Sequence, residues 1–136
     1  MVYAGGLVAY TEATAIIRNS FASGNIKILS SDSMAYSGGL IGNNKGKIIG
    51  CLAYGNVAAK GSSESYSRNG GLVGNNTGTV TDCYRSESQV LTKYTSVGVA
   101  FNEDGTIATE AEMLEYCKAN WGNEWDYTSS RPQLRR

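Results

Sequence analysis

A chain of 136 residues supports one modest domain, and an elongated fold of this mass buries a smaller share of its surface than a compact one. Lys plus Arg equal Asp plus Glu at 12 each, so no net charge steers the chain toward nucleic acid or anionic lipid. No apolar run approaches the roughly 20 residues of a membrane helix. We therefore expect no nucleic-acid partner, no membrane insertion and no cofactor.

The beginning of the chain lacks the basic region and apolar core of a secretory signal. Met1 is followed at once by a repeat that is already under way. We interpret the sequence as the C-terminal piece of a longer protein, so the missing signal says little about the compartment.

One phrase of the sequence, Gly-Gly-Leu-Val-Gly-Asn-Asn, opens residues 70–84. Residues 38–52 carry the same phrase 32 positions earlier, with Ile41 in place of valine. A looser copy starts at Gly5, and a degraded fourth copy starts at Gly98. Self-similarity at such a period is typical of stacked repeats, in which one unit cannot bury its apolar face alone. The predicted repeats are 5–37, 38–69, 70–96 and a partial 97–107.

Each repeat contains short extended pieces separated by glycine and asparagine. In the second repeat these are 39–42, 47–54 and 56–60, followed by a polar loop at 61–69. None shows the 3.6-residue apolar period of a helix, and each has the length of a strand. The sequence predicts an all-β fold: a right-handed parallel β-helix (β-solenoid) of about three to four coils, with three strands per coil and a triangular section.

Stacking would place equivalent side chains above one another. Val80 and Cys83 are three residues apart, and side chains at an odd spacing point to opposite faces of a straight strand. If both face inward, the chain must therefore turn a corner at 81–82, and likewise at 49–50 in the second repeat. The asparagine pairs at 43–44 and 75–76 should form amide ladders. The expected columns are Leu7, Leu40 and Leu72; Ile17, Ile48 and Val80; Ser20, Cys51 and Cys83; and Phe21, Leu52 and Tyr84, with Val99 and Ile107 extending the first two.

The pattern changes after Ile107, and we assign residues 108–136 to a C-terminal cap. Thr109 with Glu112 is a capping box that predicts a helix over 109–120. An open stack ends in unpaired backbone groups that recruit other chains unless they are covered. We expect this helix, with Trp121, Trp125 and Leu134, to cover that end, and the uncovered N-terminal edge to self-associate.

Three cysteines, an odd number, do not make a disulfide framework. Cys51 and Cys83 occupy the same slot in successive repeats, so stacking would bring their Cα atoms to about 4.8 Å, within disulfide range. Their side chains would point the same way, which suits a bridge poorly. Reduced, buried thiols are favoured, while a bridge, a modification or a metal stays open. Cys117 is interpreted as a core residue.

The repeats resemble the GLUG repeat of bacterial cell-surface proteins, found in adhesin-like proteins and beside the peptidase region of some IgA-cleaving metallopeptidases. Residues 71–74 and 39–42 carry the naming motif, whereas 6–9 depart from it at Ala9. Trp121 and Trp125 ahead of Arg131-Pro132-Gln133-Leu134 are similar to the C-terminal closures of such proteins. The resemblance implies surface display or secretion and adhesion without naming a ligand.

Histidine is absent, which removes Ser–His and Cys–His nucleophile pairs and imidazole-bound zinc. Among the paired carboxylates, Glu110 with Glu112 suits a helix start. Glu103 with Asp104 suits a turn, with a weak calcium site as the alternative. Glu124 and Asp126 flank Trp125, where closure of the core is favoured over a sugar cleft. No Lys-Ser or Lys-Thr closes the glycine-rich turns as a phosphate loop does.

Tyrosines are the tentative binding residues. Tyr36, Tyr66 and Tyr94 each fall shortly before the next repeat, so they would line one edge of the stack. Packing over loop backbones is the alternative. The sequence thus predicts a non-enzymatic adhesion or spacer module that binds a host glycan or protein. The second interpretation, a carbohydrate-processing β-helix, requires carboxylates that converge in one groove across successive coils.

Overall fold

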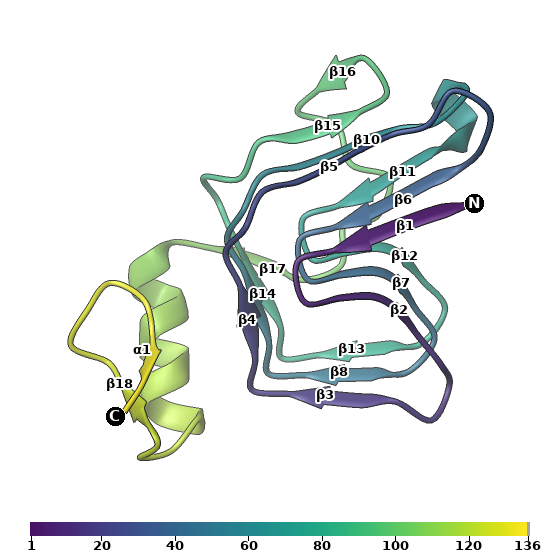
Figure 1. Cartoon of the computed structure of the whole chain (residues 1–136). Helices are drawn as coiled ribbons and strands as arrows, with labels where there is room; N and C mark the ends of the chain where they lie inside the picture. Colours follow the sequence, from purple (N-terminus) through teal and green to yellow (C-terminus); the bar gives the residue numbers. More distant parts are fainter. Residues whose placement is uncertain (136) are drawn as a thin grey trace.

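The computed structural model describes residues 1–135, which wind into a right-handed parallel β-helix with a helical appendage (Figure 1). In Figure 1 the chain runs clockwise while it recedes from the purple N-terminal coil to the green C-terminal one. The first coil holds β1 (Val2–Gly5), β2 (Val8–Thr11), β3 (Ile16–Arg18), β4 (Phe21–Ala22) and β5 (Ile26–Leu29). The second holds β6 (Ala35–Gly38), β7 (Ile41–Asn44), β8 (Lys47–Ile49), β9 (Leu52–Ala53) and β10 (Val57–Lys60).

The third coil begins with a 3-10 turn, η1 (Glu64–Tyr66), and continues with β11 (Ser67–Gly70), β12 (Val73–Asn76), β13 (Thr79–Thr81), β14 (Tyr84–Ser86) and β15 (Leu91–Lys93). The chain ends with β16 (Ser96–Val97), β17 (Thr106–Ala108), α1 (Glu110–Asn120), β18 (Trp125–Asp126) and β19 (Gln133–Leu134). No helix within residues 1–135 is long and apolar enough to cross a membrane.

Equivalent strands of the three coils pair in parallel and form five stacks. The stacks are β1-β6-β11, β2-β7-β12, β3-β8-β13, β4-β9-β14-β17 and β5-β10-β15, with β16 added antiparallel to β15. The predicted parallel β-helix is confirmed, but the prediction of three strands per coil is wrong. The loop predicted at 61–69 contains β11, and the piece predicted at 47–54 is bent into β8 and β9.

The bend between β8 and β9 lies at the predicted corner. Gly50 has φ +66, and its equivalents Asn19 and Asp82 have φ +46 and +50. This left-handed geometry favours glycine, asparagine and aspartate, the residues found there. Ile48 and Cys51 can then both face inward, and both are fully buried.

The predicted column of Leu7, Leu40 and Leu72 is formed, but Val99 does not extend it, because Asn102 already pairs with Gly70, two residues before Leu72. The backbone N–H of Leu7 donates to Leu40 O at 2.9 Å, and that of Leu40 donates to Leu72 O at 2.9 Å. Leu40 and Leu72 have no exposed surface, and burying such a side chain stabilises the fold by about 1.5–3 kcal/mol. The asparagine ladders are also confirmed, since Asn44 Nδ2 donates to Asn76 Oδ1 at 2.8 Å and Asn75 Nδ2 donates to Asn43 Oδ1 at 3.0 Å.

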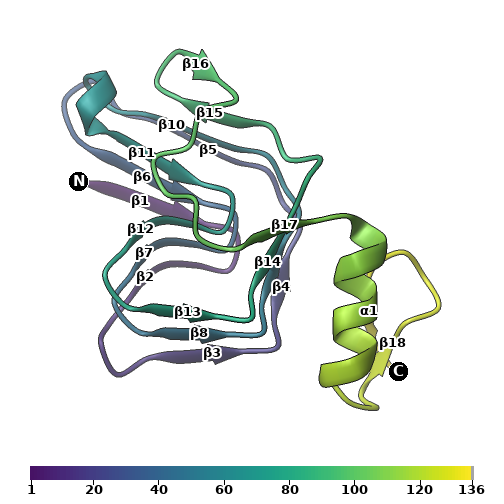
Figure 2. The same cartoon turned by 180° about the vertical axis from the view of Figure 1, so that it is seen from behind.

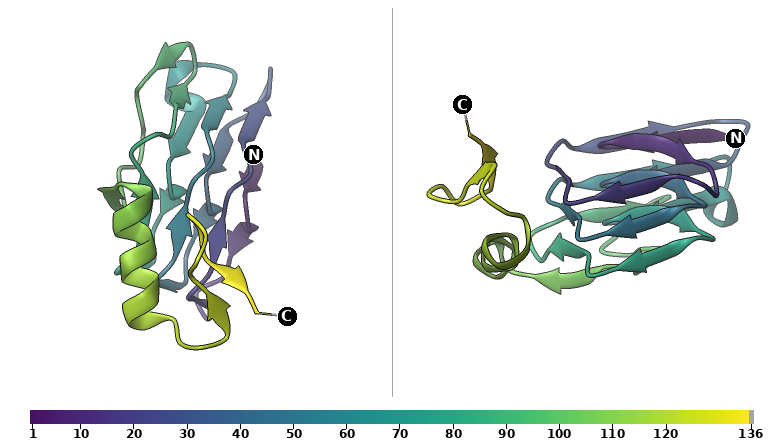
Figure 3. Two further views of the ribbon diagram at one scale, coloured as in Figure 1. Left: turned by 90° about the vertical axis from the view of Figure 1, so that its left-hand side faces the viewer. Right: turned by 90° about the horizontal axis from the view of Figure 1, so that it is seen from below.

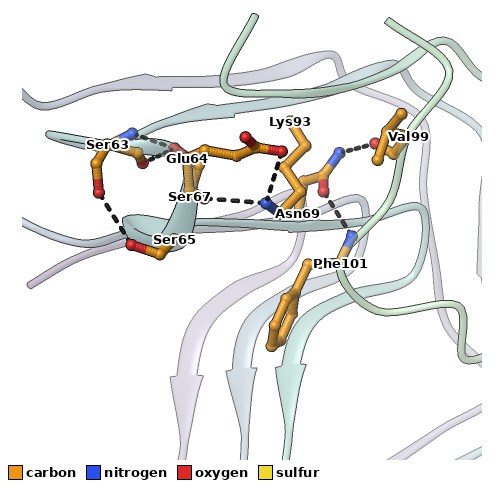
Figure 4. Close-up of polar contacts among 9 residues, drawn as sticks. Ser63, Glu64, Ser65, Ser67, Asn69, Lys93, Val99 and Phe101 are labelled. Carbon is orange, nitrogen blue, oxygen red and sulfur yellow. Dashed lines mark hydrogen bonds and ion pairs between the residues drawn. The ribbon is translucent and has the colours of Figure 1, made fainter. Parts of the chain in front are cut away.

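The C-terminal end of the stack is closed by the chain between β16 and β17. Asn69, fully buried in β11, donates from Nδ2 to Val99 O at 2.8 Å and accepts from Phe101 N at 2.9 Å (Figure 4). Asn69 thus holds the incoming segment against the third coil. The expectation that Ile107 extends the Ile17–Ile48–Val80 column is wrong, because Ile107 pairs with Arg85 in the neighbouring stack.

Helix α1 begins with the predicted capping box: Thr109 Oγ1 accepts from Glu112 N, and Thr109 N donates to Glu112 Oε1, both at 3.1 Å. The helix does not cover the end of the stack. It lies beside β14 and β17, and the segment after it extends along the same side of the stack toward β4, as the two views of Figure 3 and the rear view of Figure 2 show. The expected end cap is therefore a lateral cap.

The lateral cap has a physical reason in the outward column Phe21–Leu52–Tyr84, an apolar stripe that needs a cover. Met113, Cys117 and Trp121 of the cap form one buried cluster with Leu52 and pack against Phe21 and Tyr84. Trp121 stacks on Phe21, with ring centroids 6.3 Å apart, and donates from Nε1 to Gly50 O at 3.0 Å. One cap segment therefore binds all three coils along their side.

Candidate functional site

A shallow groove crosses the outer face of β5, β10 and β15. Two adjoining hollows of about 420 and 280 Å³ share Lys27, Ala58 and Thr92 along their floor. These three residues are paired in register across the three coils. Ala58 lies between Lys27 and Thr92, and its small side chain leaves the groove open along the stacking direction.

Two asparagines line one end of this groove and are held by the coil that follows each of them. Asn25 Oδ1 accepts from Asn56 N at 2.9 Å, and Asn56 Oδ1 accepts from Val90 N at 2.8 Å. Each amide oxygen is therefore used within the fold. The two NH₂ groups make no hydrogen bond to residues 1–135, and they present donors beside the groove.

The other end of the groove is basic and aromatic. Tyr94 has φ +58 and is fixed by its backbone N–H, which donates to Ala59 O at 2.8 Å. Lys60 Nζ lies 5.3 Å from the centroid of the Tyr94 ring, in a cation–π arrangement. Lys27 and Lys60 line the groove without an ion-pair partner among residues 1–135, and no carboxylate lines it.

The structure separates the three tyrosines that the sequence grouped together. Tyr36 is only 7% exposed and packs in register between Tyr3 and Arg68, with ring centroids 5.1 Å apart for the tyrosine pair. Tyr66 is exposed on η1, and Tyr94 lies in the groove. The predicted tyrosine edge is therefore not formed, because the position of Tyr36 belongs to a strand whose next-coil equivalent is Arg68.

An acidic hollow on another side of the stack brings Asp82 to the pair Glu103 and Asp104, which the sequence placed in a turn. Asp82, Glu103 and Asp104 line one pocket of about 320 Å³ at the corner before β14. Asp104 Oδ2 accepts from Asn76 Nδ2 at 3.0 Å, so this carboxylate ends the asparagine ladder. Among residues 1–135, no group of three or more His, Cys, Asp or Glu residues is placed to hold a metal ion.

The other carboxylates make contacts within the cap. Glu110 forms an ion pair with Arg131, whose guanidinium lies 4.4 Å from the centroid of the Tyr54 ring. Asp126 accepts from Thr128 Oγ1 at 2.7 Å, a contact that holds the pKa of Asp126 below its usual range. The Glu110–Arg131 pair ties the tail to the start of α1, whereas the Asp126–Thr128 contact is local to the tail.

All three cysteines are free and buried. Cys51 N donates to Cys83 Sγ at 3.4 Å, so the two thiols stack as the repeat predicted. Contact with Cys83, together with burial, raises the pKa of Cys51, and burial raises the pKa of Cys117 to about 12. The thiols of Cys51 and Cys117 are therefore held protonated and are poor nucleophiles, whereas the hydrogen bond with Cys51 lowers the pKa of Cys83. All three cysteines pack as small buried residues.

These observations define the class of the protein: a right-handed parallel β-helix with a lateral helical cap. A family model described as "the GLUG motif" matches residues 2–27, which span the first coil up to β5. The chain therefore contains a GLUG motif, and the predicted resemblance is confirmed. No curated protein matches the sequence.

The fold is similar to the crystal structure of a protein from Bacteroides ovatus that is provisionally named an immunoglobulin A1 protease. The TM-score is 0.69 at 19% sequence identity, and the alignment covers 96% of this chain and 52% of that one. The chain thus spans about half of the neighbour's length, and the likeness concerns the fold.

Sequence reasoning found Tyr94 and missed the rest of the groove. A signal was present: Lys27, Ala58 and Thr92 follow Ile26, Val57 and Leu91, which are three apolar residues in equivalent slots. Because strand side chains alternate between faces, the residues that follow must point outward. Their shared face could be recognised once the five-strand coil was known.

Proposed function

We propose that this chain is a non-enzymatic binding and spacing module of a cell-surface or secreted β-helix, and that it holds a glycan in the groove over β5, β10 and β15. One observation carries the proposal. A solvent-facing trough across three coils is bordered by amide donors at Asn25 and Asn56, and by Lys60 stacked on Tyr94.

The chemistry of the groove fits an acidic glycan. Tyr94 supplies a flat apolar surface with a polar tip, which suits the faces of sugar rings. Lys27 and Lys60 supply positive charge with no carboxylate beside them. The parallel strands repeat every ~4.8 Å, so a polymer lying along the stacking direction contacts the three coils in turn.

A surface location and an adhesive role are supported by the GLUG motif, whose family resemblance implies display outside the cell. A stack of hydrogen-bonded coils is also suited to hold a binding face at a distance from a neighbouring domain. A protein ligand for the same groove is the other outcome that the experiment below distinguishes.

The experiment is a binding assay on immobilised glycans. Uronate-bearing, sialylated and sulfated chains are compared with neutral chains of matched length, with a panel of host proteins alongside. We expect the acidic chains to bind and the binding to weaken at high salt. The double variant Lys60→Ala/Tyr94→Ala should lose at least about tenfold in affinity, because it removes the charge and the aromatic surface together.

Two matched controls test the position of the site. Lys47→Ala removes an exposed lysine from β8 in a different stack, and Tyr66→Ala removes an exposed tyrosine outside the groove; both should bind like the wild type. Equal binding by the groove variant and the wild type refutes the groove. Binding to a host protein and to no glycan replaces the proposed ligand class.

A second candidate, a carbohydrate-processing β-helix, is favoured by one observation. Asp82 of the third coil and Glu103 of the following segment line a common pocket, so carboxylates do converge across successive coils. Incubation of wild type and of Asp82→Asn/Glu103→Gln with the polysaccharides that bind, followed by an assay for new reducing ends or unsaturated products, tests it. Product released by the wild type and not by the variant supports this enzyme.

A further inference from the structure

Arg85 occupies a position inside the coil that alanine occupies in the preceding coils. Ala22, Ala53 and Arg85 are paired in register along β4, β9 and β14, and both alanines are buried in the central core. Across the lumen each faces a glycine: a Cβ at Gly71 would come within 2.7 Å of Arg85 Cδ. The last full coil thus places a guanidinium where the core of the stack ends.

This guanidinium has no partner among residues 1–135. Arg85 is 8% exposed, its Nε is enclosed without an acceptor, and it takes part in no hydrogen bond or ion pair there. Burial lowers the pKa of Arg85, while the charge of Glu103 acts in the opposite direction. Proteins ordinarily pair a buried charge, because leaving it unpaired is costly.

Gln89 adds an oriented acceptor beside the guanidinium. Its Nε2 donates to Gly55 O at 2.8 Å and to Gly71 O at 2.9 Å, so both amide hydrogens are used. The flipped amide would place Oε1 against these two carbonyl oxygens, which is unfavourable. Its Oε1 is therefore fixed. This oxygen is buried and has no donor among residues 1–135.

Arg85 and Gln89 lie in one pocket of about 440 Å³ at the C-terminal end of the stack. Its walls are apolar, with Leu91, Val97, Ala100 and Ile107 among them. Glu103 is exposed and lines the same pocket. An unpaired cationic donor, an unpaired acceptor and apolar walls therefore meet in one cavity of ligand size.

We propose that this pocket binds an N-acylated apolar α-amino acid carboxylate, the chemistry that a peptide presents at its C-terminal residue. The carboxylate accepts two hydrogen bonds from the guanidinium of Arg85, the geometry that arginine favours. The amide N–H next to the carboxylate donates to Gln89 Oε1. The apolar side chain of the ligand packs against Leu91 and Ile107. This site adjoins the glycan groove at Val90 and uses different polar residues.

The competing account is that Glu103 swings inward and pairs with Arg85 in solution. Glu103 is exposed and already acts on Arg85 through its charge. If Glu103 pairs with Arg85, Glu103→Gln should lower the melting temperature, because it leaves a buried charge without its partner. If the pocket receives a carboxylate ligand, removing the charge of Glu103 removes a like-charge repulsion, and the ligand should bind several-fold tighter.

The test titrates ¹⁵N-labelled protein with N-acetyl-leucine, with a tetrapeptide that ends in leucine, and with the C-terminal amide of each. We expect both acids to bind saturably and to shift the amide signals of residues 85–107, and both amides to fail. Tighter binding of the tetrapeptide identifies a peptide terminus as the source of the carboxylate, whereas equal binding identifies the free acid.

The decisive variant is Arg85→Ala, which restores the residue of the preceding coils. It should keep its melting temperature, because it removes an unpaired buried charge, and it should lose about 10- to 100-fold in affinity for the acids. Arg85→Met keeps the packing volume and serves if the alanine variant unfolds. Arg18→Ala, an exposed arginine of β3, is the matched control and should bind like the wild type.

Three results overturn the proposal. The first is equal binding of acid and amide, and the second is unchanged binding by both Arg85 variants. The third is an absence of saturable binding by the wild type and by Glu103→Gln at millimolar ligand. None of these results depends on the glycan assay, since the Arg85 variants leave Lys60 and Tyr94 in place.

Discussion

The two ends of the coil stack use the same repeat and finish differently. At the N-terminal end Leu7 is 46% exposed, whereas Leu40 and Leu72 in the same slot have no exposed surface. At the C-terminal end the chain returns across the third coil and is held there by Asn69. The outer edge of the first coil, called the open rung below, is uncovered, whereas the outer edge of the third coil is covered by the returning chain.

The difference shows that departures from the repeat mark the closed end. The slot of Asn69 holds Ala4 and Ser37 in the earlier coils, and the slot of Arg85 holds alanine. Asn69 and Arg85 both differ from the residues in the equivalent slots, and both lie in the third coil, where the core ends. Positions that match across coils specify the stack, while the unmatched Asn69 holds the segment that closes it.

The largest expected effect separates two leucines of one column. Leu40→Ala leaves a cavity between two coils and should lower the free energy of unfolding by about 2–5 kcal/mol. Leu7→Ala removes a side chain that is about half exposed and should cost less than half as much. Denaturant unfolding of the two variants measures the contrast, and equal losses would contradict the stacking order.

A smaller effect is expected at the closed end. Asn69→Ser introduces the residue of the second coil and removes both side-chain hydrogen bonds to Val99 and Phe101, which should cost about 1–3 kcal/mol. Hydrogen exchange should accelerate across 97–105 and remain slow in β7. The control is Ser37→Ala, whose hydroxyl has no partner among residues 1–135 and whose loss should be nearly neutral.

The open rung should associate weakly with a second copy. Its strands have one unpaired side, and Val2, Leu7, Ile16 and Leu29 are exposed there. We expect sedimentation equilibrium to show dimer at high protein concentration, and Leu7→Lys to abolish it. Val99→Lys places the same charge at the closed end and should leave the dimer intact. A strict monomer at every concentration would contradict this expectation.

The sequence predicted the features that depend on local or repeated patterns. The leucine column, the Gly50 corner and the Thr109 capping box each follow from residues that are adjacent or one repeat apart. The lateral position of α1 was missed because it depends on the outward column Phe21–Leu52–Tyr84. That stripe is visible in the sequence, and such an apolar face requires a cover.

The candidate sites were predicted less well for a related reason. Tyr36 and Tyr94 fall at similar distances before the second and the fourth repeat, yet Tyr36 is buried in β6 and Tyr94 borders the groove. The number of residues between a tyrosine and the next repeat does not determine which face of the strand its side chain occupies, because a shift of one residue moves the side chain to the opposite face. The Arg85 pocket could be recognised only from the register of β14 with β9, which pairs Arg85 with Ala53.

The smallest expected effect concerns the start of α1, where the chain leaves the closed end. Hydrogen bonds with Thr109 hold the pKa of Glu112 below its usual range. Glu112 therefore contributes stability above its unfolded pKa of about 4.3, and this contribution is lost as pH falls through the lower folded pKa. Glu112→Gln keeps a hydrogen-bond acceptor but removes the charge. Between neutral and acidic pH, the unfolding free energy of this variant should therefore fall less than that of the wild type. An identical pH profile for Glu112→Gln and the wild type would show that the box holds through its hydrogen bonds alone.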